Sequence, residues 1–484
     1  MQTTAGPPPA PKHTFPESLA TVTIRPGDRD YDAVRHTYTR LGSPAAVIRV
    51  RDHQDIADTL AHARTTGIPV TARSGGHGIS GRSTNDQGMV IDLSRLNTVE
   101  ILDSRSGLVR VEAGARWGDV AAALAPHGLG LSSGDTGDVG VGGLATAGGI
   151  GLMSRLHGLT IDHMRAAELV LADGSLIRTG PEHRPDLFWA VRGAGTNFGV
   201  ATAFEFQAQP VRDVIVAMTV YDAADTAAFL TRWAAAVEEA PRSLTSFLTL
   251  VAGPGGRAAA AQAMTVYAST DATQAHAALA PLLSAGPVLR NHATVTPYHR
   301  LLPAGHEPQH AQQPLTVSRS GLLDHITPPA AESMAALLTS PPAEAGGFFP
   351  RGLSFLLLRQ QLPRTNRKGR WYAQQSYASS TDLTSRQPGG RPGQLGYRWP
   401  DGLQTTSLLR VVGGGRRSAL AANRLSLPCS AGVRFLPRLK DSVEKRTGRT
   451  PQPPSPPEVD HSTCMFASRL DPCGRRFVLF PTES

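Results

Sequence analysis

Residues 73–81 read R-S-G-G-H-G-I-S-G, a glycine-rich stretch with one histidine at position 77. Four glycines within seven residues permit positive φ angles and leave consecutive backbone N–H groups uncovered, so the stretch can form a concave nest for an anion. The pattern therefore predicts a phosphate-bearing ligand held by loop amides. A lone histidine in a glycine turn is about as often a surface residue without a role, and the loop alone leaves both interpretations open.

From Gly76 onward the same stretch reads G-H-G-I-S-G, the spacing associated with dinucleotide binding in Rossmann folds. That motif needs a strand before it and a helix that opens on its third glycine. Residues 68–72 predict the strand, but residues 82–88 (RSTNDQG) contain turn residues and no apolar period. Because no helix N-terminus is available for a pyrophosphate, the sequence disfavours an NAD-binding dehydrogenase.

A second glycine-rich stretch, residues 134–151, reads GDTGDVGVGGLATAGGIG. Such density within a folded body indicates close approach of the backbone to a flat or phosphorylated ligand. The alternative is a flexible linker. The interleaved apolar residues argue against it, because such side chains usually pack in a core: Val139, Val141, Leu144 and Ile150. A third glycine-bearing turn, residues 192–200 (RGAGTNFGV), precedes a predicted strand.

In this order, the three stretches resemble the flavin-binding half of the berberine-bridge-enzyme-like family, within the vanillyl-alcohol-oxidase type of FAD oxidoreductases. The resemblance runs from about residue 44 to residue 210. It is also carried by VEAGARWGDVAAAL, LVLADG and DLFWAVRGAGTNFGV. It implies a PCMH-type FAD-binding domain, and the residues it places at the cofactor are Arg73, Ser74, Gly75, Gly76, His77, Gly78, Gly134, Thr136, Asp138, Gly140, Val141, Gly142, Gly148, Gly149, Gly199 and Val200.

In this family the histidine of the first loop is joined covalently to the 8α-methyl carbon of the flavin, so the resemblance implies that His77 carries FAD. Many members add a second bond from a cysteine in a G-T-C-P-x-V-G segment. Here residues 134–140 read GDTGDVG, with Thr136 at the cysteine position. Threonine cannot form the thioether, so a single linkage is expected.

The resemblance implies an oxidase that takes a hydride from a C–H next to oxygen or nitrogen of a small molecule, from secondary metabolism or sugar-like, with O2 as acceptor. The catalytic base stays unassigned. Tyr298 and His299 are read as a helix-start tyrosine and an exposed histidine, and His127, His157 and His163 as structural or surface residues. The competing hypothesis is a silent flavin-binding remnant, because the expected C-terminal part is disrupted.

The helices and strands expected around these residues predict an α+β protein. Strands are expected at 44–50, 68–72, 89–93, 98–102, 109–114 and 200–206, with helices at 51–63 and 117–124 and a hairpin at 169–178. A helix pair is expected at 322–338. The predicted organisation is a lead-in (1–40), an FAD-binding domain of two α/β subdomains (41–211), an incomplete α+β substrate domain with an antiparallel sheet (212–358) and an atypical tail (359–484).

Basic residues gather in that tail. Residues 359–484 hold 18 Arg and 3 Lys against 8 Asp and Glu, whereas the whole chain has a net charge of +9, so residues 1–358 are net acidic. No nucleic-acid partner is therefore expected. All three cysteines lie in the tail without metal-site spacing, and no metal is expected. Two hypotheses stay open: a reading-frame shift near Leu358, which we favour because a core strand ends there, and a natural disordered extension.

No run of 18 apolar residues occurs, so no membrane span is expected. The first 15 residues, MQTTAGPPPAPKHTF, lack the apolar region of a secretory signal and suggest a floppy lead-in. A cytoplasmic protein is the expectation from these absences, and the sequence does not indicate an oligomeric state.

Overall fold

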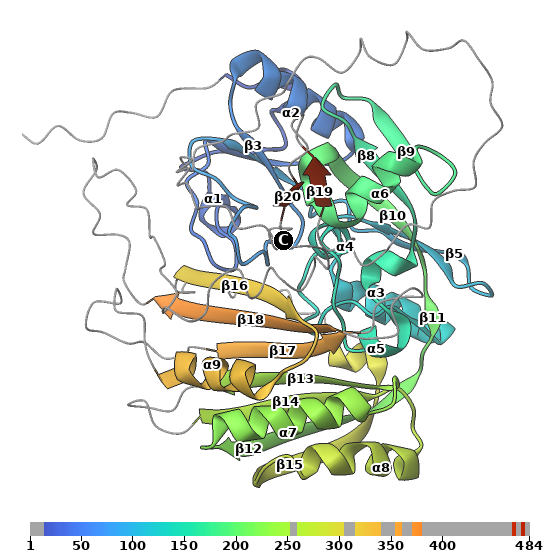
Figure 1. The fold of residues 1–484 in the computed structure, drawn as a ribbon. Coiled ribbons are helices and arrows are strands. Elements are labelled where there is room, and N and C mark those ends of the chain that lie inside the picture. The colour runs from blue at the N-terminus through green and yellow to red at the C-terminus, as the bar shows by residue number, and fades with distance from the viewer. Residues whose placement is uncertain are drawn as a thin grey trace, which may run out of the picture.

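The computed structural model describes residues 14–251, 259–303, 315–339, 354–360, 370–379, 467–470 and 476–479. In Figure 1 the described residues form two parts, one built from the N-terminal elements and one built around a long-stranded sheet. The expected mixed α+β fold with an antiparallel sheet in its second half is confirmed.

The first layer of the N-terminal part is a small mixed sheet with strand order β1-β2-β4-β3. Its strands are β1 (Thr23–Ile24), β2 (Ala46–Arg49), β4 (Met89–Asp92) and β3 (Val70–Arg73), and β4 runs parallel to both β2 and β3. Helix α2 (His53–Thr66) connects β2 to β3. No helix lies between β3 and β4 within the fully described residues 74–88, which agrees with the argument against a Rossmann site.

Helix α2 shows how the local sequence sets these boundaries. The Asp52 side chain accepts hydrogen bonds from the backbone N–H groups of Gln54 and Asp55, which fixes the helix start at His53, two residues after the expected start. Gly67 ends the helix with a left-handed φ of 74°.

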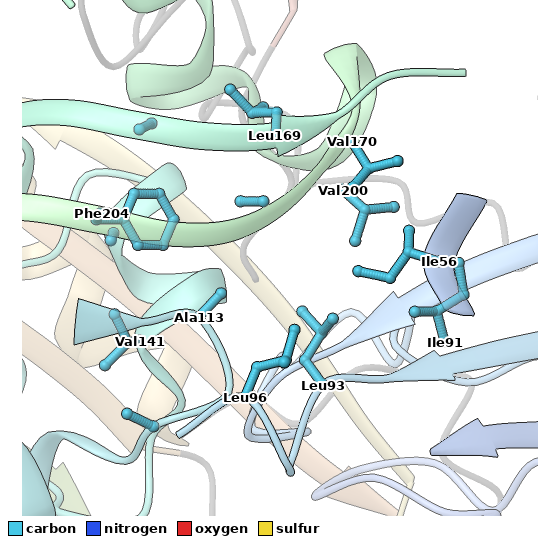
Figure 2. Close-up of a cluster of buried hydrophobic side chains, with 14 of the residues drawn as sticks. Ile56, Ile91, Leu93, Leu96, Ala113, Val141, Leu169, Val170, Val200 and Phe204 are labelled. Carbon is cyan, nitrogen blue, oxygen red and sulfur yellow. The ribbon is translucent and has the colours of Figure 1, made fainter. Parts of the chain in front are cut away.

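The second layer is an antiparallel sheet with strand order β5-β6-β10-β8-β9. Its strands are β5 (Val99–Asp103), β6 (Leu108–Glu112), β10 (Val200–Gln207), β8 (Met164–Val170) and β9 (Leu176–Thr179). Helices α3 (Trp117–Leu124), α4 (Val141–Thr146) and α6 (Pro185–Ala194) accompany it, whereas the short α5 (Ser154–His157) contacts strands of the second part. One core joins both layers: Ile56 of α2 and Ile91 of β4 belong to the same buried cluster as Leu169, Val200 and Phe204 (Figure 2).

The N-terminal segment belongs to this core as well. Phe15, Leu19 and Val22 are buried in the shared cluster, and β1 pairs antiparallel with β2. The short helix α1 (Tyr31–Val34) follows, and the Tyr31 hydroxyl donates to the carbonyl oxygen of Pro44 at 2.7 Å. Residues 14–40 therefore pack against the rest of the N-terminal part, whereas the first 13 residues, on which the floppy lead-in was expected, lie outside the described residues.

The second part of the molecule is an antiparallel sheet with strand order β15-β12-β14-β13-β17-β18-β16. Helices α7 (Thr226–Glu239), α8 (Ala272–Leu283) and α9 (Pro328–Thr339) pack with it around a core that includes Trp233 and Leu248. The strands are β12 (Asp213–Ala223), β13 (Leu244–Val251), β14 (Ala259–Tyr267), β15 (Val288–Pro297), β16 (Leu315–Leu323), β17 (Ser354–Gln360) and β18 (Arg370–Ser379).

Two details of this part differ from simple sequence patterns. The helix pair expected at 322–338 is wrong, because β16 extends to Leu323 and the single helix α9 begins only at Pro328. The described sheet also continues past residue 358, since β18 lies between β17 and β16. A short hairpin of β19 (Ala467–Leu470) and β20 (Arg476–Leu479) is described further on, and the rest of the predicted tail lies outside the described residues.

Candidate functional site

The two glycine-rich stretches meet backbone to backbone. A Cβ atom on Gly75 would lie 2.2 Å from the amide nitrogen of Gly140, and one on Gly140 would lie 2.0 Å from the amide nitrogen of Gly75. No side chain fits at either position. The contact brings together the loop that carries His77 and the loop that carries Thr136 and Asp138, as a site shared by both stretches requires.

Ser74 fixes this junction from the side of the first loop. Its hydroxyl donates to the carbonyl oxygen of Ala113 at 2.6 Å and accepts a hydrogen bond from the backbone N–H of Gly142 at 3.3 Å. The hydroxyl is thus engaged inside the protein, so any contact of Ser74 with a phosphate falls to its backbone.

Arg73 is also engaged inside the fold. Its guanidinium lies 2.5 Å from a carboxylate oxygen of Asp92, and both side chains are buried. It also donates to the carbonyl oxygens of Val34 and His36. Burial alone would raise the pKa of Asp92, but the Arg73 charge and the backbone N–H of Ser94 outweigh burial and hold the pKa below its ordinary value. The Arg73 charge is therefore balanced within the protein.

Arg116 is a site residue that the sequence analysis did not single out. It immediately precedes α3, and its guanidinium donates to the carbonyl oxygen of Gly75 at 2.8 Å and to that of Asp138. Burial lowers the pKa of Arg116, and the Asp138 carboxylate acts in the opposite direction. One side chain thus ties the two glycine loops together and places a positive charge at their junction. The only sequence signal was its place in the VEAGARWGDVAAAL segment.

A buried polar atom at the same junction has no partner in the part of the chain that the structure describes. The Oδ1 atom of Asp138 is buried and has no hydrogen-bond partner among the described residues. A buried carboxylate oxygen without a donor is costly, and a ligand hydroxyl or N–H group would supply the missing hydrogen bond. The glycine contact, the Arg116 charge and this acceptor fit a phosphate-bearing ligand that also carries hydroxyl and N–H groups, as FAD does.

His77 follows β3 in the first loop and is half-buried. Its imidazole stacks on the ring of Tyr38, with centroids 5.3 Å apart and an interplanar angle of 12°. The neighbouring Gly76 has a φ of 73°, and the Gly78 carbonyl closes a turn by accepting from the N–H of Gly81 at 3.0 Å. The histidine therefore projects from a tightly wound loop.

The remaining predicted residues fall into two groups. Val141 and Val200 have buried side chains in the hydrophobic core (Figure 2), so only their backbones are available to a cofactor. Thr136 is exposed, and its hydroxyl lies 3.2 Å from a carboxylate oxygen of Asp135. The predicted glycines with positive φ beyond the first loop are Gly134, Gly148, Gly149 and Gly199.

The second glycine loop also touches the other half of the molecule. A Cβ on Gly137 would lie 1.9 Å from the carbonyl oxygen of Pro303, just after the short 3-10 helix Tyr298–Leu301. Gly148 is different: its φ is 118° and no atom lies within 4 Å of the position that a Cβ would take, so space is open there. The junction of the glycine loops thus lies next to the boundary between the two parts.

One tyrosine and several histidines outside the glycine loops were also considered from the sequence, and the structure shows their burial and hydrogen bonds. Tyr298 starts its 3-10 helix, as expected, but it is buried, and its hydroxyl donates to the carbonyl oxygen of Leu131 at 2.9 Å. Burial raises the pKa of this phenol, which does not suit a base. His299 is half-buried rather than exposed. His163 is buried and its pKa is lowered to about 4, first by burial and then by His157 and Arg165.

Two negative findings apply to the part of the chain that the structure describes. No three His, Cys, Asp or Glu side chains gather there as a metal site requires. None of its helices combines the length and apolar character needed to cross a membrane.

Comparison with known proteins agrees with this geometry. Residues 44–180 match the FAD binding domain family. This part of the chain is an FAD binding domain. It contains both loops of the junction, Arg116 and His77.

Over 239 residues the chain is 36% identical to (R)-6-hydroxynicotine oxidase of Paenarthrobacter nicotinovorans, an alignment that covers 49% of this chain and 50% of that protein. The chain therefore spans only half the length of this relative. The crystal structure of 6-hydroxy-D-nicotine oxidase from Arthrobacter nicotinovorans superposes with a TM-score of 0.62 at 26% identity, covering 74% of this chain and 81% of the other.

Glucooligosaccharide oxidase from Acremonium strictum shares the fold, with a TM-score of 0.62 at 21% identity over 74% of this chain and 79% of the other. The cofactor of that oxidase is a 6-S-cysteinyl, 8α-N1-histidyl FAD, which is bound through both a cysteine and a histidine. The fold of this chain is thus that of FAD-binding oxidases of the PCMH type, as expected.

Proposed function

We propose that the protein is an FAD-dependent oxidase that removes a hydride from a C–H bond next to oxygen or nitrogen of a small molecule, with O2 as acceptor. The observation that carries this proposal is the contact of Gly75 with Gly140 beside His77, within an FAD binding domain. The names of relatives, among them a nicotine oxidase and a xylooligosaccharide oxidase, support the reaction class.

Bound FAD would supply the two-electron chemistry, taking up a hydride from the substrate and passing the electrons on to O2. The chain's own residues bind and orient it. Backbone groups of residues 74–78 and of Gly140 would hold its phosphate-bearing part, and Arg116 would add a positive charge there. The Oδ1 atom of Asp138, which has no donor among the described residues, would accept a hydrogen bond from a hydroxyl or N–H group of the cofactor.

His77 is proposed as the covalent attachment point. The bond joins an imidazole nitrogen to the 8α carbon of the flavin. The imidazole N–H and one methyl C–H are lost, and their two protons and two electrons pass to O2 as H2O2. Because Thr136 has a hydroxyl where a thiol is needed, this protein should carry one linkage, unlike the glucooligosaccharide oxidase.

Acid precipitation tests the linkage. The wild-type protein should be yellow and keep its flavin in the precipitate, and a digest should show flavin on the His77 peptide alone. His77→Ala should release FAD into the supernatant. Flavin that washes out of the wild type would contradict the covalent assignment but not FAD binding.

Anaerobic mixing with a panel of alcohols, sugars and cyclic amines tests the oxidase activity. A substrate should bleach the flavin absorbance near 450 nm, and admitting O2 should restore it with one H2O2 per turnover. If no compound bleaches a flavin that dithionite can reduce, the competing hypothesis of a silent flavin-binding protein gains support.

A further inference from the structure

The loop that carries His77 is enclosed by a segment far earlier in the chain. We call residues 34–43 the clasp; they run from the last residue of α1 toward β2. The backbone N–H of Tyr38 donates to the carbonyl oxygen of Gly76 at 2.8 Å. The hydroxyl of Thr39 donates to the carbonyl oxygen of Ile79 at 2.9 Å. Two consecutive clasp residues thus hold the backbone on either side of His77.

The clasp is itself anchored at both ends. At its start, Arg73 donates to the carbonyl oxygens of Val34 and His36 from within the buried pair with Asp92. The first half of the clasp is also bonded to the segment between the His77 loop and β4. There the Thr84 hydroxyl donates to the Arg35 carbonyl oxygen at 2.7 Å.

The far end of the clasp is held by one carboxylate. Asp86 accepts from the Arg40 guanidinium at 2.7 Å and from the N–H and hydroxyl groups of Ser43 at 3.0 and 2.8 Å. Burial would raise the pKa of Asp86, but these donors outweigh burial and lower it, so Asp86 stays ionised at neutral pH. The clasp therefore has a fixed position relative to the loop at its start, middle and end.

The clasp side chain that stacks on the His77 ring is that of Tyr38. The rings are nearly parallel, at 12°, with centroids 5.3 Å apart, which is an offset stack. Because the Tyr38 backbone is bonded to Gly76, the base of its side chain is fixed relative to the backbone next to His77. The stack therefore restricts rotation of the imidazole about its side-chain torsions.

From this geometry we propose that Tyr38 is a positioning residue for flavin attachment: it holds the imidazole plane of His77 in the orientation that bond formation needs. The inference rests on the proposed covalent role of His77. A nucleophile held in one orientation reacts faster than one that samples several, because less freedom is lost on reaching the reactive geometry. Tyr38 itself neither binds the flavin nor exchanges a proton in this proposal.

The test measures attachment separately from binding. Apoprotein of the full chain is mixed with excess FAD in air, and samples are taken over time. Total FAD is read after desalting, and covalent FAD is read as in-gel fluorescence after denaturing electrophoresis. Tyr38→Leu should bind FAD within about threefold of wild type but form the covalent bond about 3- to 10-fold more slowly, the range expected for losing one aromatic pair.

Two further variants separate stacking from folding. Tyr38→Phe keeps the ring and should attach flavin within about twofold of wild type, which restores the effect by a conservative change. Thr39→Val removes the neighbouring bond to Ile79 but keeps the stack, so it should resemble Tyr38→Phe. Circular dichroism and melting temperature show whether each variant folds.

The outcomes are distinguishable. Attachment to Tyr38→Leu at the wild-type rate overturns this inference and leaves the proposed function intact. Equal slowing of Tyr38→Leu, Tyr38→Phe and Thr39→Val would show that any loosening of the clasp slows attachment, and it also overturns the specific role of the ring. A wild-type protein that never gains acid-stable flavin overturns the covalent role of His77 and this inference together.

Discussion

The small mixed sheet that leads into the His77 loop is built from short strands, whereas the sheet of the second part contains much longer ones. Strands β2, β3 and β4 have four residues each, but β12 has eleven and β15 has ten. Around the loops, polar contacts such as the buried Arg73–Asp92 pair and the partly buried Arg116–Gly75 hydrogen bond determine the geometry. In the long sheet, apolar side chains such as Trp233 and Leu248 form the core.

This difference suggests unequal tolerance to substitution. A buried polar network fails when a single partner is lost, because the remaining charge or dipole stays buried without compensation. An antiparallel sheet spreads its stability over many backbone hydrogen bonds and side-chain contacts. Single changes in the loop half should therefore have specific effects, and changes on the exposed edge of the sheet should have small ones.

The largest effect is expected at the buried ion pair. Asp92→Ala leaves the Arg73 guanidinium buried without its carboxylate and should lower the free energy of unfolding by about 3–5 kcal/mol. Denaturant unfolding monitored by circular dichroism measures it. As a control, Asp32→Ala breaks an exposed pair with Arg35 and should cost less than about 1 kcal/mol. Equal costs for both variants would contradict the comparison.

The buried His163 should make the free energy of unfolding depend on pH. Its folded-state pKa of about 4 lies below the ordinary value of 6.5, so the unfolded chain binds the proton more tightly in this range. Stability should therefore fall as the pH drops from about 6.5 to 4, by roughly 2–3 kcal/mol from this residue. His163→Gln should remove that part of the slope, and an unchanged slope in this variant would count against a buried neutral histidine.

The glycine junction should respond to one added methyl group. Gly75→Ala places a Cβ 2.2 Å from the Gly140 nitrogen, so the two loops must separate. Overpacking of this kind costs about 1–3 kcal/mol, and FAD titration should show affinity reduced by about tenfold or more. Gly180→Ala is the matched control, because its Cβ would meet only the Arg165 carbonyl oxygen at 3.3 Å. Unaltered FAD affinity in Gly75→Ala would remove the junction from the cofactor site.

The smallest effect is expected on edge strand β15. Leu289 is 65% exposed, so Leu289→Lys should change the free energy of unfolding by no more than about 0.5 kcal/mol and should improve solubility. The same residue type in the core gives the contrast: Leu248→Ala should cost about 2–5 kcal/mol. A large loss in Leu289→Lys would show that another surface covers this edge.

The sequence predicted the local features of the loop half well. Asp52 and Gly67 mark the ends of α2 through side-chain and backbone chemistry that is readable from a few residues. Helix α3 begins at Trp117 and ends at Leu124, as expected, because its apolar residues follow a helical period. The glycine stretches were recognised because dense glycine among residues that pack indicates close approach of the backbone.

Contacts between distant segments could not be predicted in the same way. Nothing in the residues near position 38 indicates that Tyr38 stacks on His77, since the two are brought together by the path of the chain around β2. The role of Arg116 depends on two loops that meet only in the folded protein. The helix pair expected at 322–338 failed because Leu322 and Leu323 belong to a strand whose partner, β18, lies almost fifty residues further on.

The boundary between the two halves has a consequence for how the protein unfolds. Arg155, just after the glycine loop, donates to the carbonyl oxygens of Val237 and Ala240 at the C-terminal end of α7, and Arg242 donates back to the Arg155 carbonyl oxygen. These bonds occupy helix-end carbonyls that would otherwise be left buried without donors. Neither half can open alone without exposing groups that the other half satisfies. The two halves are therefore coupled as a single cooperative unit, and heating should melt them together.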